Sequence, residues 1–150
     1  MRVKELMTDM PQACGVGDSA NEAARIMWER DCGAVPVVDR DGHTVGIVTD
    51  RDICMAAYFQ GRPLSAIPVA DIMSRDLCTV EAEAELSEAE RLMQARQVRR
   101  LPVVANGGRL IGILSLSDVA RGVPRSTGRP GAPESQELLR TVEKVSEPRP

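Results

Sequence analysis

The sequence predicts an α/β fold of the α+β kind, in which two β-α-β-β-α repeats pack about a pseudo-twofold axis into one module. Three observations support this fold class: an internal repeat, the same order of helical and β-rich segments in each copy, and an aliphatic core. The chain has 150 residues, of which 43% are hydrophobic, but it contains only one Trp, one Tyr and one Phe. A chain of this length forms one domain or two small units that share a core.

The repeat has an offset of 66 positions. In this register Pro36-Val37-Val38 aligns with Pro102-Val103-Val104, Gly46 with Gly112, and Asp52 with Asp118, without a gap from Val3 to Val123. Self-similarity at a fixed period indicates a duplicated structural unit. Because one copy is too short to bury a comfortable core alone, we expect the two copies to pack on each other through their sheets.

The repeat sets the expected domain boundaries. The first repeat with its lead-in spans 1–61, a linker spans 62–68, the second repeat spans 69–123, and a tail spans 124–150. Pro63 and Pro68 in the linker fit a connection. In the tail, 124–133 (PRSTGRPGAP) has the composition of a flexible arm. A short amphipathic helix is predicted over 134–145, and both docking on a neighbour and disorder are compatible with its sequence.

Each repeat begins with a short strand and a helix. The strands are expected near 13–16 and 78–80. The helices follow from apolar residues spaced as one buried helical face: Ala20, Ala23, Ala24 and Met27 in the first copy, and Leu86, Ala89 and Met93 in the second. Capping boxes are predicted from Ser19 with Glu22 and from Ser87 with Glu90.

Two further strands and a helix complete each repeat. The strands are expected over 34–38 and 45–48, and over 101–104 and 110–114, with glycine-bearing turns between them. The first copy then continues as a helix over 50–60, which Gly61 is expected to end.

Composition excludes several classes of function. The net charge is −3 and aromatic residues are rare, so the chain lacks the basic surface and the stacking residues of a nucleic-acid-binding protein. No stretch approaches the ~20 apolar residues of a membrane span, and the first ten residues contain no signal-peptide core. The four cysteines have neither metal-ligand nor C-x-x-C spacing. We therefore expect a cytoplasmic protein with reduced thiols.

The most informative motif occurs once in each repeat. The stretch GIVTDRDI (46–53) contains Thr49-x-x-Asp52, and GILSLSDV (112–119) contains Ser115-x-x-Asp118. Both have the form of a helix N-cap, in which a hydroxyl accepts a backbone N–H and an acid lies near the positive helix end. The same geometry offers free N–H groups to a phosphate, so structural and ligand-binding interpretations both remain open.

The doubled pattern resembles a known family. The stretches VPVVDRDGHTVGIVTDRDI (35–53) and LPVVANGGRLIGILSLSDV (101–119) resemble CBS domains, arranged in tandem as a Bateman module of the stand-alone bacterial type. The dipeptides Met7-Thr8 and Met73-Ser74 match the usual opening of each copy, and the resemblance covers 1–123. It implies a regulatory sensor without catalytic residues, which binds AMP, ADP, ATP or another adenosine derivative such as S-adenosylmethionine in the cleft between the repeats.

The resemblance also implies partners and assembly. Such modules commonly form a disk-like homodimer and require no cofactor. Without an attached effector domain, the signal would pass through assembly or through an effector protein that the sequence does not name.

The family pattern implies which residues contact the ligand. Thr49 and Asp52, and likewise Ser115 and Asp118, correspond to the ribose and phosphate contacts. Gly46 and Gly112 would let the backbone run close to the ligand. The adenine would lie near Thr79 and Val80, or near Cys14 and Val16 in the first copy.

Basic residues distinguish the two copies. Arg99 and Arg100 resemble the basic pair that contacts phosphate in nucleotide-binding relatives, whereas the first copy has Gly33 and Ala34 there. If a basic residue of the first copy compensates for the missing arginine pair, it is Arg51. We therefore expect unequal sites, with the site of Ser115, Asp118 and Arg100 binding phosphate better; a solvated cationic helix end is the plain structural alternative.

Other functions remain as alternatives. The main one is a CBS pair that binds no ligand and acts as a protein-interaction or dimerisation module, because capping alone would retain both motifs. Residues 15–20 (GVGDSA) fit the glycine pattern of an NAD-binding enzyme, although the second copy has a row of acids there. A thiol switch at Cys14 or Cys78 is a further alternative. A metal site at Asp39, Asp41 and His43 lacks a fourth ligand, and we expect no catalytic constellation.

Overall fold

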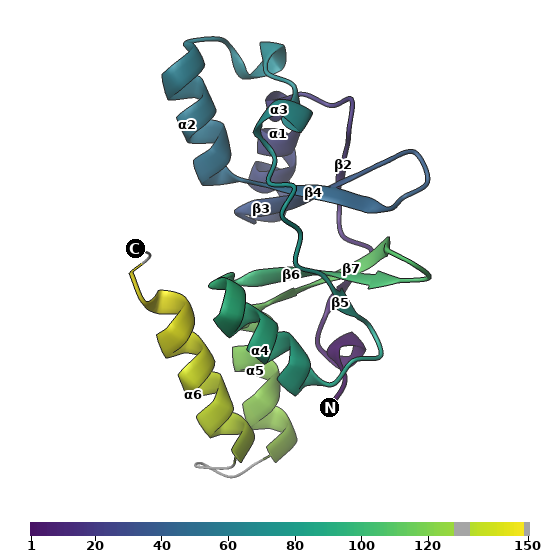
Figure 1. Ribbon diagram of the computed structural model, residues 1–150, viewed down its shortest axis with the longest axis vertical. Helices are drawn as coiled ribbons and strands as arrows, with labels where there is room; N and C mark the ends of the chain where they lie inside the picture. The colour runs from purple at the N-terminus through teal and green to yellow at the C-terminus, as the bar shows by residue number, and fades with distance from the viewer. Residues whose placement is uncertain (128–132, 149–150) are drawn as a thin grey trace. The chain divides into compact units, whose positions relative to one another are not determined.

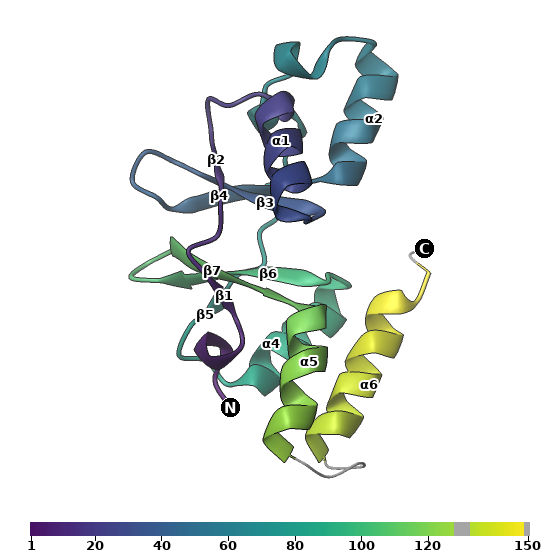
Figure 2. The ribbon, with the colours of Figure 1, turned by 180° about the vertical axis from the view of Figure 1, so that it is seen from behind.

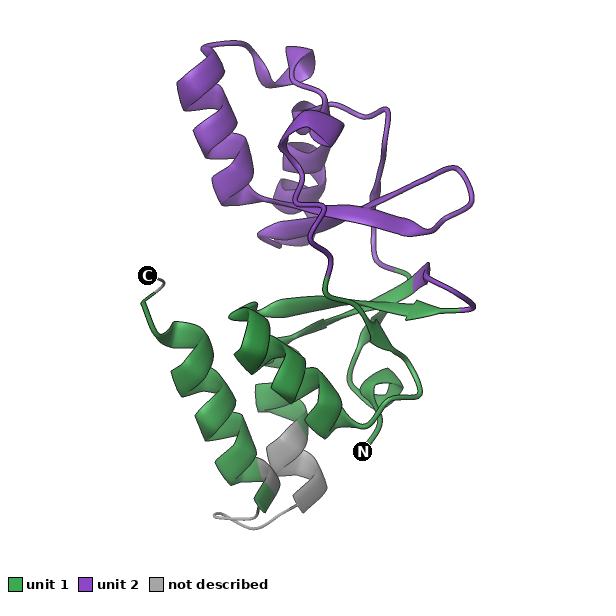
Figure 3. Cartoon of the chain, in the orientation of Figure 1, with its two compact units in different colours: residues 1–10, 78–105, 111–150 green, residues 11–77, 106–110 purple. Residues whose placement is uncertain are grey.

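A computed structural model shows two sheets, each covered by helices, and confirms the predicted fold class (Figure 1). It describes the backbone of residues 1–127 and 133–148, and the side chains of 1–122, 133 and 135–148. The chain divides into two compact units, which Figure 3 shows in different colours. Unit 1 contains residues 1–10, 78–105 and 111–150, and unit 2 contains residues 11–77 and 106–110.

Unit 2 is built mainly from the first repeat. Strand β2 (Cys14–Gly15) leads through α1 (Ala20–Arg30) to β3 (Ala34–Val38), and β4 (Thr44–Thr49) leads into α2 (Asp50–Gln60). The sheet order is β2-β3-β4, with β2 parallel and β4 antiparallel to β3. The predicted stop at Gly61 is confirmed, because Gly61 ends α2 in the left-handed conformation at φ 60°.

Unit 1 repeats this order. Strand β5 (Val80–Glu81) is followed by α4 (Leu86–Arg96), β6 (Arg100–Ala105), β7 (Arg109–Ser115) and α5 (Leu116–Thr127). The N-terminal segment adds the short 3-10 helix η1 (Val3–Glu5) and strand β1 (Thr8–Asp9), which gives the sheet order β1-β7-β6-β5. Each unit has its own aliphatic core.

The predicted linker is part of unit 2. It contains the 3-10 helix η2 (Leu64–Ala66), and the short helix α3 (Val69–Ile72) follows it. Ile67 is fully buried in the core, and its carbonyl accepts a hydrogen bond from the N–H of Ala20 at 2.8 Å. Residues 62–68 are therefore a structural element of this unit as well as a connection.

The helix starts predicted for the early helices were only partly right. Ser19 is the N-cap of α1, but its side chain makes no capping hydrogen bond. Helix α4 begins at Leu86 after Glu85, so the capping box predicted from Ser87 and Glu90 is wrong. The reason is burial: Glu90 is 4% exposed and lies on the inner face of α4.

The C-terminal region is more helical than the flexible arm predicted from 124 onward. Helix α5 continues through Pro124 to Thr127, and α6 (Pro133–Ser146) occupies the region where a helix was predicted over 134–145. Residues 128–132 of the predicted arm lie outside the described residues. Helix α6 packs against α4 and α5 of the same unit, as two opposite views show (Figures 1 and 2).

The units do not follow the sequence repeats at their N-terminal ends. The N-terminal segment of the first repeat (residues 1–10, its lead-in) belongs to unit 1, where Thr8 and Asp9 pair with Ile113 and Gly112 of β7. The equivalent lead-in of the second repeat belongs to unit 2, where Ser74 exchanges two backbone hydrogen bonds with Ile47. Each repeat therefore supplies the segment that completes the other repeat's sheet.

A methionine of each exchanged lead-in packs on a glycine. A Cβ built on Gly112 would lie 2.5 Å from the sulfur of Met7 and 3.1 Å from the carbonyl oxygen of Thr8. A Cβ built on Gly46 would lie 2.8 Å from Cγ of Met73. A side chain at either position would force the methionine to move and would press on the backbone of the lead-in, so both positions favour glycine for steric reasons.

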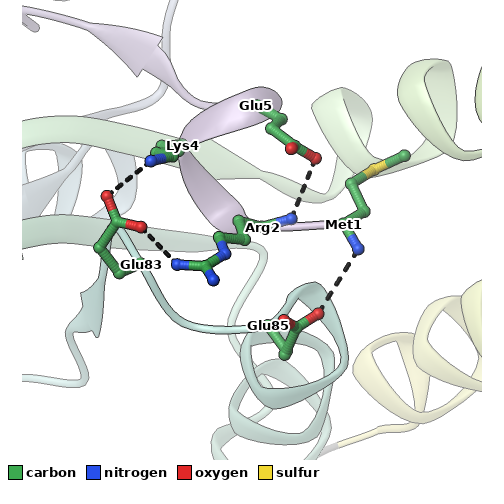
Figure 4. Close-up of polar contacts among 6 residues, drawn as sticks. All are labelled: Met1, Arg2, Lys4, Glu5, Glu83 and Glu85. Atoms are coloured by element: carbon green, nitrogen blue, oxygen red, sulfur yellow. Dashed lines mark hydrogen bonds and ion pairs between the residues drawn. The ribbon is translucent and has the colours of Figure 1, made fainter.

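Backbone and ionic contacts hold the first lead-in within unit 1, and Figure 4 shows the ionic contacts to Glu83 and Glu85. The N–H groups of Val3 and Lys4 donate to the carbonyls of Ala84 and Ala82, both at 3.0 Å. Arg2 and Lys4 both contact the carboxylate of Glu83, at 2.6 and 2.7 Å. Because these ion pairs are exposed, the burial of Val3 and the backbone bonds contribute more to this attachment.

No helix in the described ranges 1–127 and 133–148 has the length and apolar character needed to cross a membrane.

The glycine contacts yield a stability prediction. We expect Gly112→Ala to lower the free energy of unfolding by about 1–3 kcal/mol, because the added methyl meets both a side chain and a backbone carbonyl. Thermal unfolding would measure the loss. Gly17→Ala is the matched control, since a Cβ on Gly17 has no neighbour within 4 Å.

The double variant Met7→Ala/Gly112→Ala tests the cause. If the methyl group clashes with Met7, the two losses will not add, because truncating Met7 relieves part of the strain. Strict additivity, or a normal melting temperature for Gly112→Ala, would contradict this packing.

Candidate functional site

The N-terminus of α5 forms the first candidate site. The N–H of Ser115 donates to Oδ2 of Asp118 at 2.9 Å, and the N–H of Asp118 donates to Oγ of Ser115 at 3.1 Å. Ser115 Oγ also donates to Oδ2 of Asp118 at 2.6 Å. The second oxygen, Oδ1, accepts a bond from Arg121 at 2.7 Å. The predicted helix cap is confirmed here, and both oxygens of Asp118 have partners.

The N-terminus of α2 forms the equivalent site of unit 2. The N–H of Thr49 donates to Oδ2 of Asp52 at 2.8 Å, and the N–H of Asp52 donates to Oγ1 of Thr49 at 3.2 Å. Within the part of the chain that the structure describes, Oδ1 of Asp52 accepts no hydrogen bond. Each capping acid therefore uses its Oδ2 atom for the helix cap. The Oδ1 atom of Asp118 also has a partner, whereas Oδ1 of Asp52 has none among the described residues.

The two glycines have a role that the sequence did not reveal. Gly46 and Gly112 are buried, and the space above them is occupied by Met73 and Met7. The requirement for glycine therefore comes from the exchanged lead-ins. The expectation that these glycines admit a ligand to the backbone has no support in this arrangement.

Arg99 and Arg100 lie beside the cap of α5. The carbonyl of Arg99 accepts a hydrogen bond from the N–H of Leu116, the first residue of α5, at 2.8 Å. Arg99 is exposed and Arg100 is half-buried. Neither guanidinium has an acidic partner among the described side chains. The backbone of Arg99 thus meets the N-terminus of α5, and basic residues at such a position suit the binding of a phosphate group.

The corresponding place in unit 2 has a different charge. The carbonyl of Gly33 accepts a hydrogen bond from the N–H of Asp50 at 3.1 Å, just as the carbonyl of Arg99 accepts one from the N–H of Leu116. Here, however, the first turn of α2 carries two acids, Asp50 and Asp52, and Arg51 is the only cation in it. Because two carboxylates repel a phosphate, the charge pattern favours the site of unit 1.

Two of the four residues predicted to contact adenine are in the cores. Val80 is 3% exposed and Cys14 is fully buried, each within the apolar cluster of its own unit. Thr79 is half-buried, and Val16 is 42% exposed. A ligand at Val80 would therefore contact its backbone, whereas Thr79 and Val16 can offer side-chain contacts.

The alternatives based on residues 15–20 and on the thiol of Cys14 lose support. The N–H of Gly15 is bound by Oδ2 of Asp18 at 2.8 Å, so a carboxylate closes the loop where a dinucleotide phosphate would lie. None of the four cysteines is in a disulfide. Burial, aided by Asp18 and Glu22, raises the pKa of Cys14 to about 11. Its thiolate, the reactive form, is therefore scarce at neutral pH.

Asp39, Asp41 and His43 do lie together. Their candidate ligand atoms are within 4.8 Å of one another. The Oδ1 atom of Asp39 already accepts bonds from the N–H groups of Asp41 and His43, which lowers the pKa of Asp39. The guanidinium of Arg109 lies beside Gly42 in the same turn. The cluster is explained by turn formation and by a neighbouring cation that disfavours a metal.

The sequence reasoning missed an apolar surface on unit 2. A cavity of about 490 Å³ opens between α1 and α2, and its lining includes Met27, Cys32, Ile53 and Leu64. Trp28 of α1 lines this cavity, and all three aromatic residues of the chain lie on α1 or α2 and are exposed: Trp28 at 89%, Tyr58 at 77% and Phe59 at 78%. The rarity of aromatics in the sequence was visible, but their position outside the core was not.

Comparisons with known proteins agree with the duplicated pattern. The family model described as "CBS domain" matches residues 3–58 and again 69–125. "Uncharacterized protein YlbB" of Bacillus subtilis (strain 168) is 42% identical over 120 residues, which cover 79% of this chain and 80% of that protein.

Two solved structures show the same fold with small molecules bound. CBSX2, determined in complex with AMP, has a TM-score of 0.73 and 28% identity, covering 83% of this chain and 97% of that one. The CBS domain pair of protein MJ0100, in complex with 5-methylthioadenosine and S-adenosyl-L-methionine, has a TM-score of 0.72 and 27% identity, covering 81% and 98%.

The repeat, its two capped helix starts and these matches lead to one assignment: the chain belongs to the CBS domain family and carries two CBS domains in tandem.

Proposed function

We propose that this protein is a non-catalytic, cytoplasmic regulatory module that senses an adenosine nucleotide such as AMP, ADP or ATP. The observation that carries the proposal is that the backbone of Arg99, next to Arg100, contacts the capped N-terminus of α5, and that neither guanidinium has an acidic partner among the described side chains. The AMP bound to CBSX2 and the adenosine derivatives bound to MJ0100 support this class of ligand.

The roles of the site residues follow from their chemistry. Arg100 and Arg99 bind the phosphate, aided by the helix N-terminus. Asp118 accepts hydrogen bonds from the ribose hydroxyls, with Ser115 holding it in place, and Thr79 and the backbone of Val80 contact the base. For this, Arg121 must release Oδ1 of Asp118. Because Arg121 is 68% exposed, that pair contributes little to stability and is readily replaced.

Unit 2 provides a weaker site. Thr49 and Asp52 can hold a ribose, and the unpaired Oδ1 of Asp52 is available for it. Asp50 and the absence of a basic pair at Gly33 and Ala34 disfavour phosphate there, and Arg51 compensates only partly. A nucleoside, which has no phosphate, would bind to the two units with more similar affinities.

We predict that the nucleotide stabilises the protein through unit 1. At about 100 times its dissociation constant, a ligand raises the free energy of unfolding by roughly 2.7 kcal/mol, which shifts the melting temperature by several degrees. Thermal unfolding with AMP, ADP, ATP and S-adenosylmethionine measures this shift. No shift with any of them would contradict the proposal.

Substitutions assign the site. We expect Arg100→Ala to weaken binding roughly 10- to 100-fold, since a charge-assisted hydrogen bond to phosphate is lost, whereas Arg51→Ala has a small effect. Asp118→Asn retains an oxygen for the helix cap but loses the charge. If Asp52→Asn reduced nucleotide affinity, measured by calorimetry, as much as Asp118→Asn does, the sites would not be unequal.

A second candidate function is protein interaction without a ligand, and the surface between α1 and α2 favours it. Exposed aromatic residues on the two helices that flank an apolar cavity are typical of protein interfaces. We propose a homodimer as the occupant, in keeping with the family resemblance. Signalling would then act through this assembly or through an effector protein bound to it.

The dimer gives a separate prediction. We expect the variant Tyr58→Ser/Phe59→Ser to dissociate into monomers in sedimentation equilibrium, because both side chains are removed from the interface. Met10→Ser is the control, since Met10 is also highly exposed, at 89%, but belongs to unit 1 and to neither α1 nor α2. A monomeric wild-type protein, or a dimer that survives the double substitution, would rule out this interface.

A further inference from the structure

Helix α6 covers the outer helical face of unit 1. Val145 and Thr141 of α6 are buried, and Leu138 packs on the same core cluster. Two residues of unit 1 bind α6 with their side-chain amides. Gln94 donates to Oε1 of Glu137 at 2.8 Å and to Oγ1 of Thr141 at 2.9 Å, and Gln97 donates to the carbonyl of Lys144 at 3.4 Å.

An acid with no hydrogen-bond partner among the described residues lies under this helix. Glu90 of α4 is 4% exposed, and its Oε1 atom is buried without a partner. The first repeat has Ala24 at the equivalent position, so neither the fold nor the packing of α4 requires a carboxyl group there. Burying a charged carboxylate in this state is unfavourable.

The charged groups near Glu90 do not neutralise it. Glu137 faces it from α6 and adds repulsion. Arg140, also on α6, is directed to Glu137 at 3.7 Å, and Lys144 pairs with Glu147. From α5, Arg121 pairs with Asp118, and the side chain of Arg125 lies outside the described residues. Of the groups described, none gives Glu90 a counterion.

We propose that α6 is a proton-controlled cover: it holds the helical face of unit 1 when Glu90 is protonated and loosens when Glu90 becomes charged. This regulatory role does not depend on nucleotide binding. The face beneath it, formed by α4 and α5, is the counterpart of the open α1 and α2 surface of unit 2 at the 66-residue offset. Loosening α6 would therefore expose a second face of the kind that α1 and α2 form in unit 2.

The direction of the pH dependence follows from linkage. Burial and the charge of Glu137 raise the pKa of Glu90 to about 7 in the docked state, well above the ordinary range of a glutamate. The docked state therefore binds more protons than the undocked state. Docking is strongest below pH ~4.5, weakens as the pH rises from there through about 7, and changes little above that.

Hydrogen exchange of the α6 amides in the full chain tests the proposal. Between pH 5.5 and pH 8 we expect their protection, corrected for intrinsic exchange and compared with β6, to fall up to roughly 30-fold. Glu90→Gln should keep α6 protected at both pH values, because the neutral amide replaces the protonated acid. Glu88→Gln, on the exposed side of α4, is the matched control and should retain the wild-type dependence.

Two results would overturn the proposal. One is equal protection of α6 at pH 5.5 and pH 8 in the wild-type protein. The other is an unchanged pH dependence in Glu90→Gln. If Glu90→Gln does not fold, Glu137→Gln serves instead: removing the facing charge should lower the pH midpoint of loosening, and an unmoved midpoint would count against the proposal.

Discussion

The structure depends on two contacts in which a methionine lies on a glycine. Met7 covers Gly112 and Met73 covers Gly46, and each contact joins a lead-in from one repeat to a strand of the other. The glycines are therefore needed by the fold before any ligand is considered. They also lie three residues before Ser115 and Thr49, so the same packing fixes the strand ends from which both capped helices begin.

Most elements of each repeat could be predicted because their signals are local. Gly61 stops α2, and Thr49 with Asp52 caps it through neighbours in the sequence. What could not be predicted depends on contacts between distant segments. Met7 and Gly112 are far apart in the chain, and no local pattern indicates that they touch. Likewise, the hydroxyl of Ser87 suggested a cap because the sequence did not show that Glu90 is buried.

The residues of the candidate site could be predicted from the sequence. Whether their side chains are free to contact a ligand could be predicted less well. Ser115 and Asp118 were identified from the repeat, and Arg99 and Arg100 from the resemblance to the family. Only the structure shows that Arg121 occupies the second oxygen of Asp118 and that Val80 is buried. The differences between the repeats are single substitutions on one backbone plan: Ala34 against Arg100, Asp50 against Leu116, and Ala24 against Glu90. They give the two units different electrostatics while the chain path stays the same.

The exchanged lead-ins also bear on how such a chain arose. A polypeptide with only one repeat would have a lead-in with no strand to join and a glycine with no methionine above it. In a domain-swapped pair of such polypeptides, each lead-in would join the sheet of the other copy, and its methionine would cover the other copy's glycine. Fusion of the two copies into one gene would then retain this exchange of lead-ins within a single chain. On this view the pairing of Thr8 with Ile113, and of Ser74 with Ile47, is the remnant of an ancestral subunit interface.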